Sequence, residues 1–101
     1  MPEPIRFMWE SRADFPLWIN GDHPTDEDDW PGLSPELVEE LHEWCDFHTR
    51  HIEEREPWRG PSNAGAVSWD QTNRFVETEG VRLAARVQAE LGPAYVVTFT
   101  A

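Results

Sequence analysis

Carboxylates gathered in the middle of the chain are the groups with the greatest potential for binding chemistry. Residues 22–56 hold thirteen Asp and Glu side chains against two arginines, so this segment carries −11 of the formal net charge of −12. Such a concentration costs self-repulsion in the folded state, and it builds a directional field that attracts cationic partners. The pattern therefore predicts a surface that binds a basic partner.

Four of these acids, at positions 26–29, directly precede Trp30. An oxygen-rich loop can hold a hard cation, but an EF-hand loop needs alternating acids, a central glycine and a distant bidentate glutamate, and this spacing differs. A large aromatic ring beside carboxylates is typical of a hot spot that faces an Arg- or Lys-rich surface. The alternative is that Trp30 closes the core over the start of the next helix. The sequence leaves both interpretations open.

His48 and His51 offer a second kind of chemistry, because imidazole can ligate a metal or act as a general base. With a carboxylate such as Glu43 or Glu54 they could supply part of a metal site, although helical zinc sites usually pair His at i, i+4 with a third ligand. We expect His48 and Cys45 to be core residues on one apolar stripe. No nucleophile or Gly-rich motif accompanies them. We therefore expect no enzymatic activity, no metal and no cofactor.

Length and composition restrict the class of protein further. A chain of 101 residues is expected to form one domain over residues 1–101, and its single cysteine fits a reducing compartment. The sequence shows neither a signal-peptide pattern nor an apolar run of membrane-spanning length, so we expect a cytoplasmic protein. A net charge of −12 without any lysine argues against binding nucleic acid or an anionic membrane, because phosphate binding relies on Lys and Arg.

Alternating apolar and polar residues predict the strands that accompany the acidic segment. Alternation over residues 5–10 and 15–20 predicts a hairpin joined by a polar turn at 11–14. Pro16 cannot donate to a strand ladder, so we expect the second strand at a sheet edge. Residues 95–100 alternate as a third strand. We place the first strand in the centre, between the other two.

Two helices are marked by their start signals. Ser34 is a good N-cap and Pro35 fits the first helical position. Ser68 and Gln71 have the spacing of a capping box. Gly80 falls inside the apolar stripe of the second helix, where glycine costs about 1 kcal/mol, so we infer the close approach of another backbone. The order β-β-α-α-β predicts an α+β two-layer sandwich, with a three-stranded sheet packed on two helices.

Several short segments resemble a group of short actinobacterial proteins to which no function is assigned. They are Phe-Pro-Leu-Trp at 15–18, Leu-Ser-Pro-Glu-Leu at 33–37, Glu-Gly at 79–80, Leu-Ala at 83–84 and Glu-Leu-Gly at 90–92. These segments are structural signals and imply no activity. In composition the chain is also similar to acidic immunity proteins that neutralise secreted toxins, and to phage inhibitors that imitate nucleic acid.

We predict a stoichiometric inhibitor, most concretely an immunity protein that covers the basic cleft of a toxin or nuclease. Charge would steer the encounter, and aromatic anchors would slow dissociation. The alternatives are a small metal- or ligand-binding domain that uses His48 and His51, and a homodimeric structural domain. We expect a monomer or weak homodimer when unbound. The predicted partner-binding residues are Asp26, Asp28, Asp29 and Trp30 of the loop, and Glu36, Glu39, Glu40, Glu43, Asp46 and Phe47 of the first helix.

Overall fold

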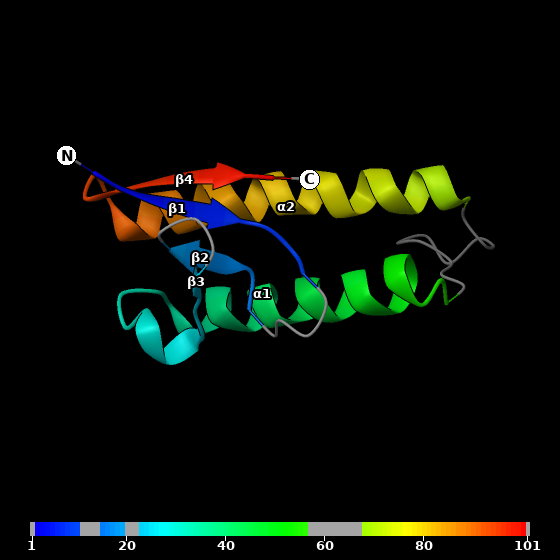
Figure 1. Cartoon of the computed structure of the whole chain (residues 1–101), viewed down its shortest axis with the longest axis horizontal. Coiled ribbons are helices and arrows are strands. Elements are labelled where there is room, and N and C mark those ends of the chain that lie inside the picture. The colour runs from blue at the N-terminus through cyan, green and yellow to red at the C-terminus, as the bar shows by residue number, and fades with distance from the viewer. Residues whose placement is uncertain (1, 11–14, 20–22, 57–67, 101) are drawn as a thin grey trace.

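A sheet and a pair of long helices form two layers in the computed structural model of the protein, which describes residues 2–10, 15–19, 23–56 and 68–100 (Figure 1). The α+β class is therefore confirmed. The predicted turn at 11–14 lies outside the described residues. The elements in chain order are β1 (Glu3–Phe7), β2 (Leu17–Ile19), β3 (His23–Pro24), the 3-10 helix η1 (Glu27–Asp29), α1 (Pro35–His48), the π-helical turn η2 (Thr49–Glu53), α2 (Trp69–Leu91) and β4 (Tyr95–Phe99).

The sheet has four strands in the order β3-β2-β1-β4. As predicted, β1 lies between β2 and β4, with Ile5 opposite Ile19 of antiparallel β2 and opposite Val97 of parallel β4. The prediction of three strands with the second at an edge is wrong. Pro16 precedes β2, and the outer side of β2 pairs with β3, whose Pro24 lies opposite Trp18. The proline that blunts this edge is therefore in β3.

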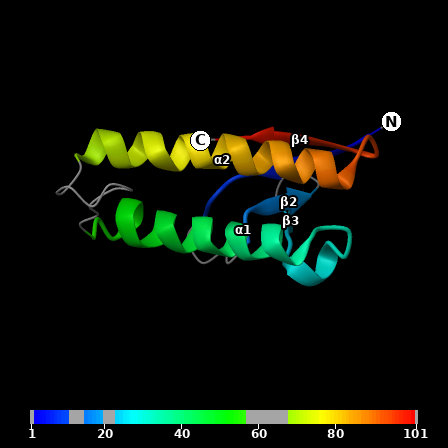
Figure 2. The ribbon, with the colours of Figure 1, turned by 180° about the vertical axis from the view of Figure 1, so that it is seen from behind.

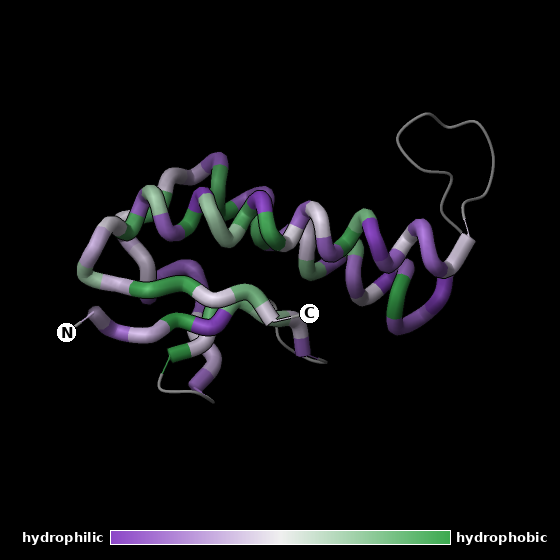
Figure 3. The backbone as a smooth tube through the Cα atoms, turned by 90° about the horizontal axis from the view of Figure 1, so that it is seen from above, coloured by the Kyte–Doolittle hydropathy of each residue, from purple (hydrophilic) through white to green (hydrophobic). Residues whose placement is uncertain are grey.

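The two helices run antiparallel on one side of the sheet and extend past its end (Figures 1 and 3). Both predicted N-caps form. Ser34 Oγ accepts from Leu37 N at 3.2 Å, and Ser68 and Gln71 bond each other's backbone N–H at 3.2 and 3.1 Å. Neither these helices nor the shorter ones in the described residues have the length and apolar character needed to cross a membrane.

Aromatic rings join the two layers in the core. Trp44 of α1 meets the ring of Phe7 edge-on at 5.0 Å and donates from Nε1 to the Val76 carbonyl of α2 at 3.0 Å. Gly80 of α2 lies directly under Phe99, since a Cβ at this position would stand 2.7 Å from the Phe99 Cζ. The inference of a close approach at Gly80 was right in kind, but the neighbour is an aromatic side chain of β4 and not another backbone.

Candidate functional site

Four exposed carboxylates follow one side of α1. Glu36, Glu39, Glu43 and Asp46 stand at i, i+3, i+7 and i+10, a spacing that keeps them on one helical face. Among the described residues, the only ion pair of these four joins Asp46 to Arg50 at 3.4 Å. We call these four residues the acidic ridge. Most of its negative charge therefore faces solvent without a counter-ion in the part of the chain that the structure describes.

A shallow groove of about 580 Å³ separates the acidic ridge from the loop before α1. Glu27 and Asp28 of η1 line it from one side, and Glu39 and Glu43 of the ridge line it from the other. His42 also lines the groove and lies 3.6 Å from Glu27. We call this feature the loop groove. It brings acids of the loop and acids of the helix, separated in sequence, around one concave surface.

The other two predicted loop acids hold the shape of η1. Asp26 Oδ1 accepts from Asp28 N at 3.0 Å, and Asp29 Oδ2 accepts from Asp26 N at 2.9 Å. This reciprocal capping box satisfies backbone donors at the start of the turn. Asp26 and Asp29 are exposed but do not line the loop groove. Their direct effect is to fix the turn that presents Glu27 and Asp28.

Trp30 lies beneath the loop, with 6% of its surface exposed. Its Nε1 donates to Thr25 Oγ1 at 2.7 Å, and that hydroxyl donates to the Leu17 carbonyl of β2 at 2.6 Å. The ring meets Tyr95 edge-on at 5.6 Å. Trp30 therefore closes the core under the acidic loop, the second of the two interpretations, and the little surface it exposes also lines the loop groove.

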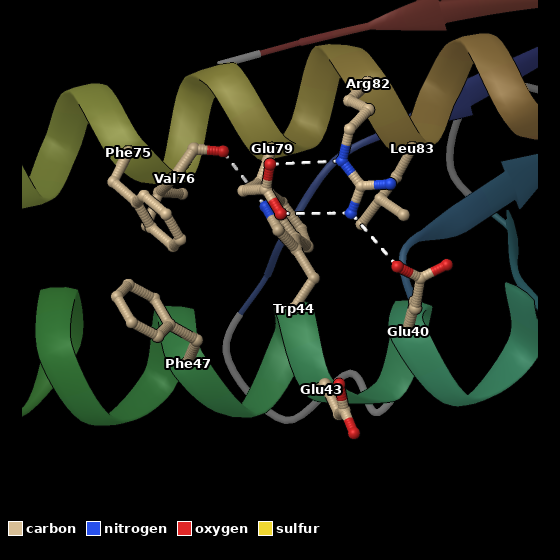
Figure 4. Close-up of a pocket in the computed structure, with 9 residues that line it drawn as sticks. All are labelled: Glu40, Glu43, Trp44, Phe47, Phe75, Val76, Glu79, Arg82 and Leu83. Carbon is tan, nitrogen blue, oxygen red and sulfur yellow. Dashed lines mark hydrogen bonds and ion pairs between the residues drawn. The ribbon is translucent and has the colours of Figure 1, made fainter. Parts of the chain in front are cut away.

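A second hollow, of about 180 Å³, lies between α1 and α2 (Figure 4). Figure 2 shows the two helices from the side that faces away from the sheet. In Figure 4 the strands likewise lie behind the two helices. Phe47 and Phe75 face each other across one end of this hollow, with ring centroids 5.2 Å apart. Glu43 lines both this interhelix hollow and the loop groove. The acidic ridge thus has a concave surface on each flank.

Glu40 differs from the acids of the ridge because it points toward α2. Arg82 Nη2 lies 3.1 Å from one Glu40 oxygen, and Arg86 pairs with the other. Arg82 also bonds Glu79, at 3.0 and 3.1 Å (Figure 4). The hydrogen bonds that Arg82 donates to Glu79, and then to Glu40, raise the pKa of its guanidinium. The charge of Glu40 is therefore balanced within the fold, where it links the two helices.

His48 is half-buried, and its ring packs against two indole rings. Its ring stacks on Trp9 at 4.2 Å and meets Trp44 edge-on at 5.5 Å, while its buried Nδ1 has no hydrogen-bond partner among the described residues. Burial lowers the pKa of His48. His51 Nδ1 lies 2.8 Å from a backbone carbonyl. The part of the chain that the structure describes holds no group of three or more His, Cys, Asp or Glu suited to a metal ion.

Glu27 and Phe75 line these concave surfaces but were absent from the predicted site. Glu27 was part of the acidic loop, but nothing in the sequence separated it from its neighbours. Phe75 carried a clearer signal, since it is an aromatic residue on an otherwise charged face of α2. The structure explains this residue by its contact with Phe47 across the interhelix hollow.

Comparison with known proteins assigns the chain to a family. A model of the family described as Serratia CdiI immunity protein-like matches residues 3–101, which is nearly the whole sequence. No curated protein matches the chain. No solved structure matches it. On the extent of the family match, the chain belongs to the Serratia CdiI immunity protein-like family.

Proposed function

We propose that this protein neutralises a toxin by covering a basic surface of the toxin with the acidic ridge and the loop groove. Membership of an immunity protein family supports an inhibitor that binds a toxin partner, rather than an enzyme. The finer proposal rests on one observation: Glu27 and Asp28 of the loop and Glu39 and Glu43 of the helix line the same groove.

The physical reason for this choice of surface is its unbalanced charge. Glu36, Glu39 and Glu43 have no ion pair among the described residues, so their field extends into solvent. A toxin that acts on nucleic acid needs cationic groups in its cleft, because phosphate binding relies on Lys and Arg. Complementary fields raise association rates and orient the encounter. The acidic ridge and the loop groove together would occupy such a cleft and block access to it.

Charge reversal on the acidic ridge tests the proposal. The binding partner in the test is the cognate toxin, captured from the native host, and the measurement is its association rate at low and high salt. The triple variant Glu36→Lys, Glu39→Lys, Glu43→Lys should slow association by about tenfold or more at low salt and flatten its salt dependence.

A matched control separates a local site from the overall charge of the protein. Glu10, Asp70 and Glu77 are exposed and lie outside the ridge and both concave surfaces that flank it. Their replacement by Lys changes the net charge by the same amount as the ridge variant. Equal slowing in the two variants would show that binding depends on net charge alone, and it would remove the ridge from the interface.

A further inference from the structure

We propose that the interhelix hollow receives one arginine side chain of the toxin, an inference that rests on the proposed function. The hollow is the right size for a side chain rather than a loop, at about 180 Å³. It also adjoins the acidic ridge, because Glu43 lines both the hollow and the loop groove. A partner that covers the ridge therefore reaches the mouth of the hollow without a change in the fold.

The walls of the hollow suit the apolar stem and flat head of an arginine. Trp44, Val76 and Leu83 line it with buried apolar surface, at 6%, 5% and 2% exposed. Phe47 and Phe75 are only half-buried, so part of each ring remains open to solvent. A guanidinium stacks on aromatic faces, and its methylene stem covers apolar surface while the charge stays at the rim.

Charge favours a cation over the other side chains that such walls could hold. Three carboxylates line the hollow, those of Glu40, Glu43 and Glu79. Arg82 also lines it, and Arg86 pairs with Glu40 from beside it, so Glu43 supplies the charge that has no ion pair in the described residues. Arg82 is already engaged by Glu79 and Glu40. Figure 4 shows Glu43 apart from this cluster, with its carboxylate directed away from α2. Glu43 nevertheless lines the hollow. An acidic side chain would be repelled here, and an incoming guanidinium would find a carboxylate at the mouth.

Arg82 itself supports the choice of arginine over lysine. Its guanidinium lies in the hollow and bonds one carboxylate from each helix, Glu79 at 3.0 Å and Glu40 at 3.1 Å (Figure 4). The spacing of the two helices therefore already accommodates a planar, fork-shaped cation between acidic groups. A second guanidinium, placed against the Phe47 and Phe75 rings, would lie between the same two helices at the other end of the hollow and stack on aromatic faces.

The test uses a small probe in place of the toxin. Nα-acetyl-L-arginine methylamide is titrated into the full chain, with the norleucine analogue as the uncharged control, and the ring resonances of Phe47 and Phe75 are followed by NMR. We expect saturable shifts with the arginine compound, with a Kd on the order of millimolar, and none with norleucine at equal concentration. Equal shifts from norleucine would make the hollow an apolar site, and the absence of shifts from both would overturn the proposal.

Two single substitutions locate the contact. Glu43→Gln and Phe75→Leu should each weaken binding of the arginine compound by about two- to fivefold, the range for exposed charge and cation–π contacts. Glu77→Gln removes an exposed carboxylate of α2 that lines neither the hollow nor the loop groove, and it should leave the affinity unchanged. An equal loss in Glu77→Gln would reduce the effect to general electrostatics. Because no toxin takes part, failure here is distinguishable from failure of the ridge variant in the association measurement.

Discussion

The side chain of Gln88 bonds the outer edge of β4 at Val97. Gln88 Oε1 accepts from Val97 N at 2.8 Å, and Nε2 donates to the Tyr95 carbonyl at 2.8 Å. In a strand of a parallel pair, successive residues direct their backbone N–H and C=O groups to opposite sides of the strand. The register of β4 with β1 therefore directs the backbone groups of Tyr95 and Val97 away from β1. One amide side chain thus takes the place of a neighbouring strand on an edge that would otherwise be open.

Removal of this amide should expose the β4 edge. Gln88→Ala leaves Val97 N and the Tyr95 carbonyl without these partners, so we expect a stability loss of about 1–3 kcal/mol and self-association through β4. Sedimentation velocity over a range of concentrations measures the second effect. Gln71→Ala is the matched control, because it removes a helix cap without touching the sheet. A wild-type dimer, or a monomeric Gln88→Ala variant at high concentration, would contradict this role of Gln88.

The acidic loop should contribute to association through the two residues that line the groove. We expect Glu27→Arg with Asp28→Arg to lower the association rate with the toxin by about three- to tenfold at low salt. The same exchange at Asp70 and Glu77 of α2 gives the same change in net charge away from the groove and should have less effect. The measurement is stopped-flow association at two salt concentrations. If the two variants match in rate, the loop lies outside the interface.

Gly80 should be intolerant of even one added methyl group. Gly80→Ala improves helix propensity by about 1 kcal/mol, but its Cβ would overlap the Phe99 ring, which also packs near Phe7 at 5.7 Å. Overpacking of this kind costs about 1–3 kcal/mol, so the net effect should be a loss of stability in urea unfolding.

A second substitution identifies the cause of that loss. In the double variant Gly80→Ala, Phe99→Leu, the smaller side chain leaves room for the methyl group. The double variant should therefore be more stable than the sum of the single effects predicts, by about 0.5–3 kcal/mol of coupling. Simple additivity would show that Phe99 is not what excludes a side chain at position 80.

Local signals in the sequence predicted the helices well. Ser34 and Ser68 act as caps because a cap depends only on residues within one turn, and the structure has both. The alternation of residues 5–10 and 95–100 likewise predicted that β1 and β4 exist, but β1 spans Glu3–Phe7 and ends three residues before the predicted boundary. The short strand β3 was missed, since two residues with Pro24 carry no alternation for a pattern to detect.

Features set by packing between distant segments could not be predicted. Glu40 and Glu43 are three residues apart and chemically identical, yet Glu40 is balanced by Arg82 and Arg86, and Glu43 faces solvent. Only the side on which α2 lies distinguishes them. The burial of Trp30 was likewise unpredictable, because it depends on a hydrogen bond to Thr25 and a contact with Tyr95, which is distant in sequence. The charge was therefore predictable from sequence, but the division between structural and solvent-facing acids was not.

His48 should make the stability of the protein depend on pH in a known direction. Burial between Trp9 and Trp44 lowers the pKa of the folded-state imidazole below the ordinary value of 6.5. Below pH 6.5 the unfolded chain binds a proton that the folded protein resists, so this contribution to stability is complete above pH 6.5 and is lost as the pH falls. Urea unfolding of the wild type and of His48→Gln, compared from pH 7.5 to pH 5, isolates the effect, because the carboxylates titrate in both proteins. The free energy of unfolding of the wild type should fall relative to the variant as the pH drops. Parallel curves would mean that His48 accepts a proton as readily when folded as when unfolded, and that its packing between two indole rings imposes no cost on the charged form.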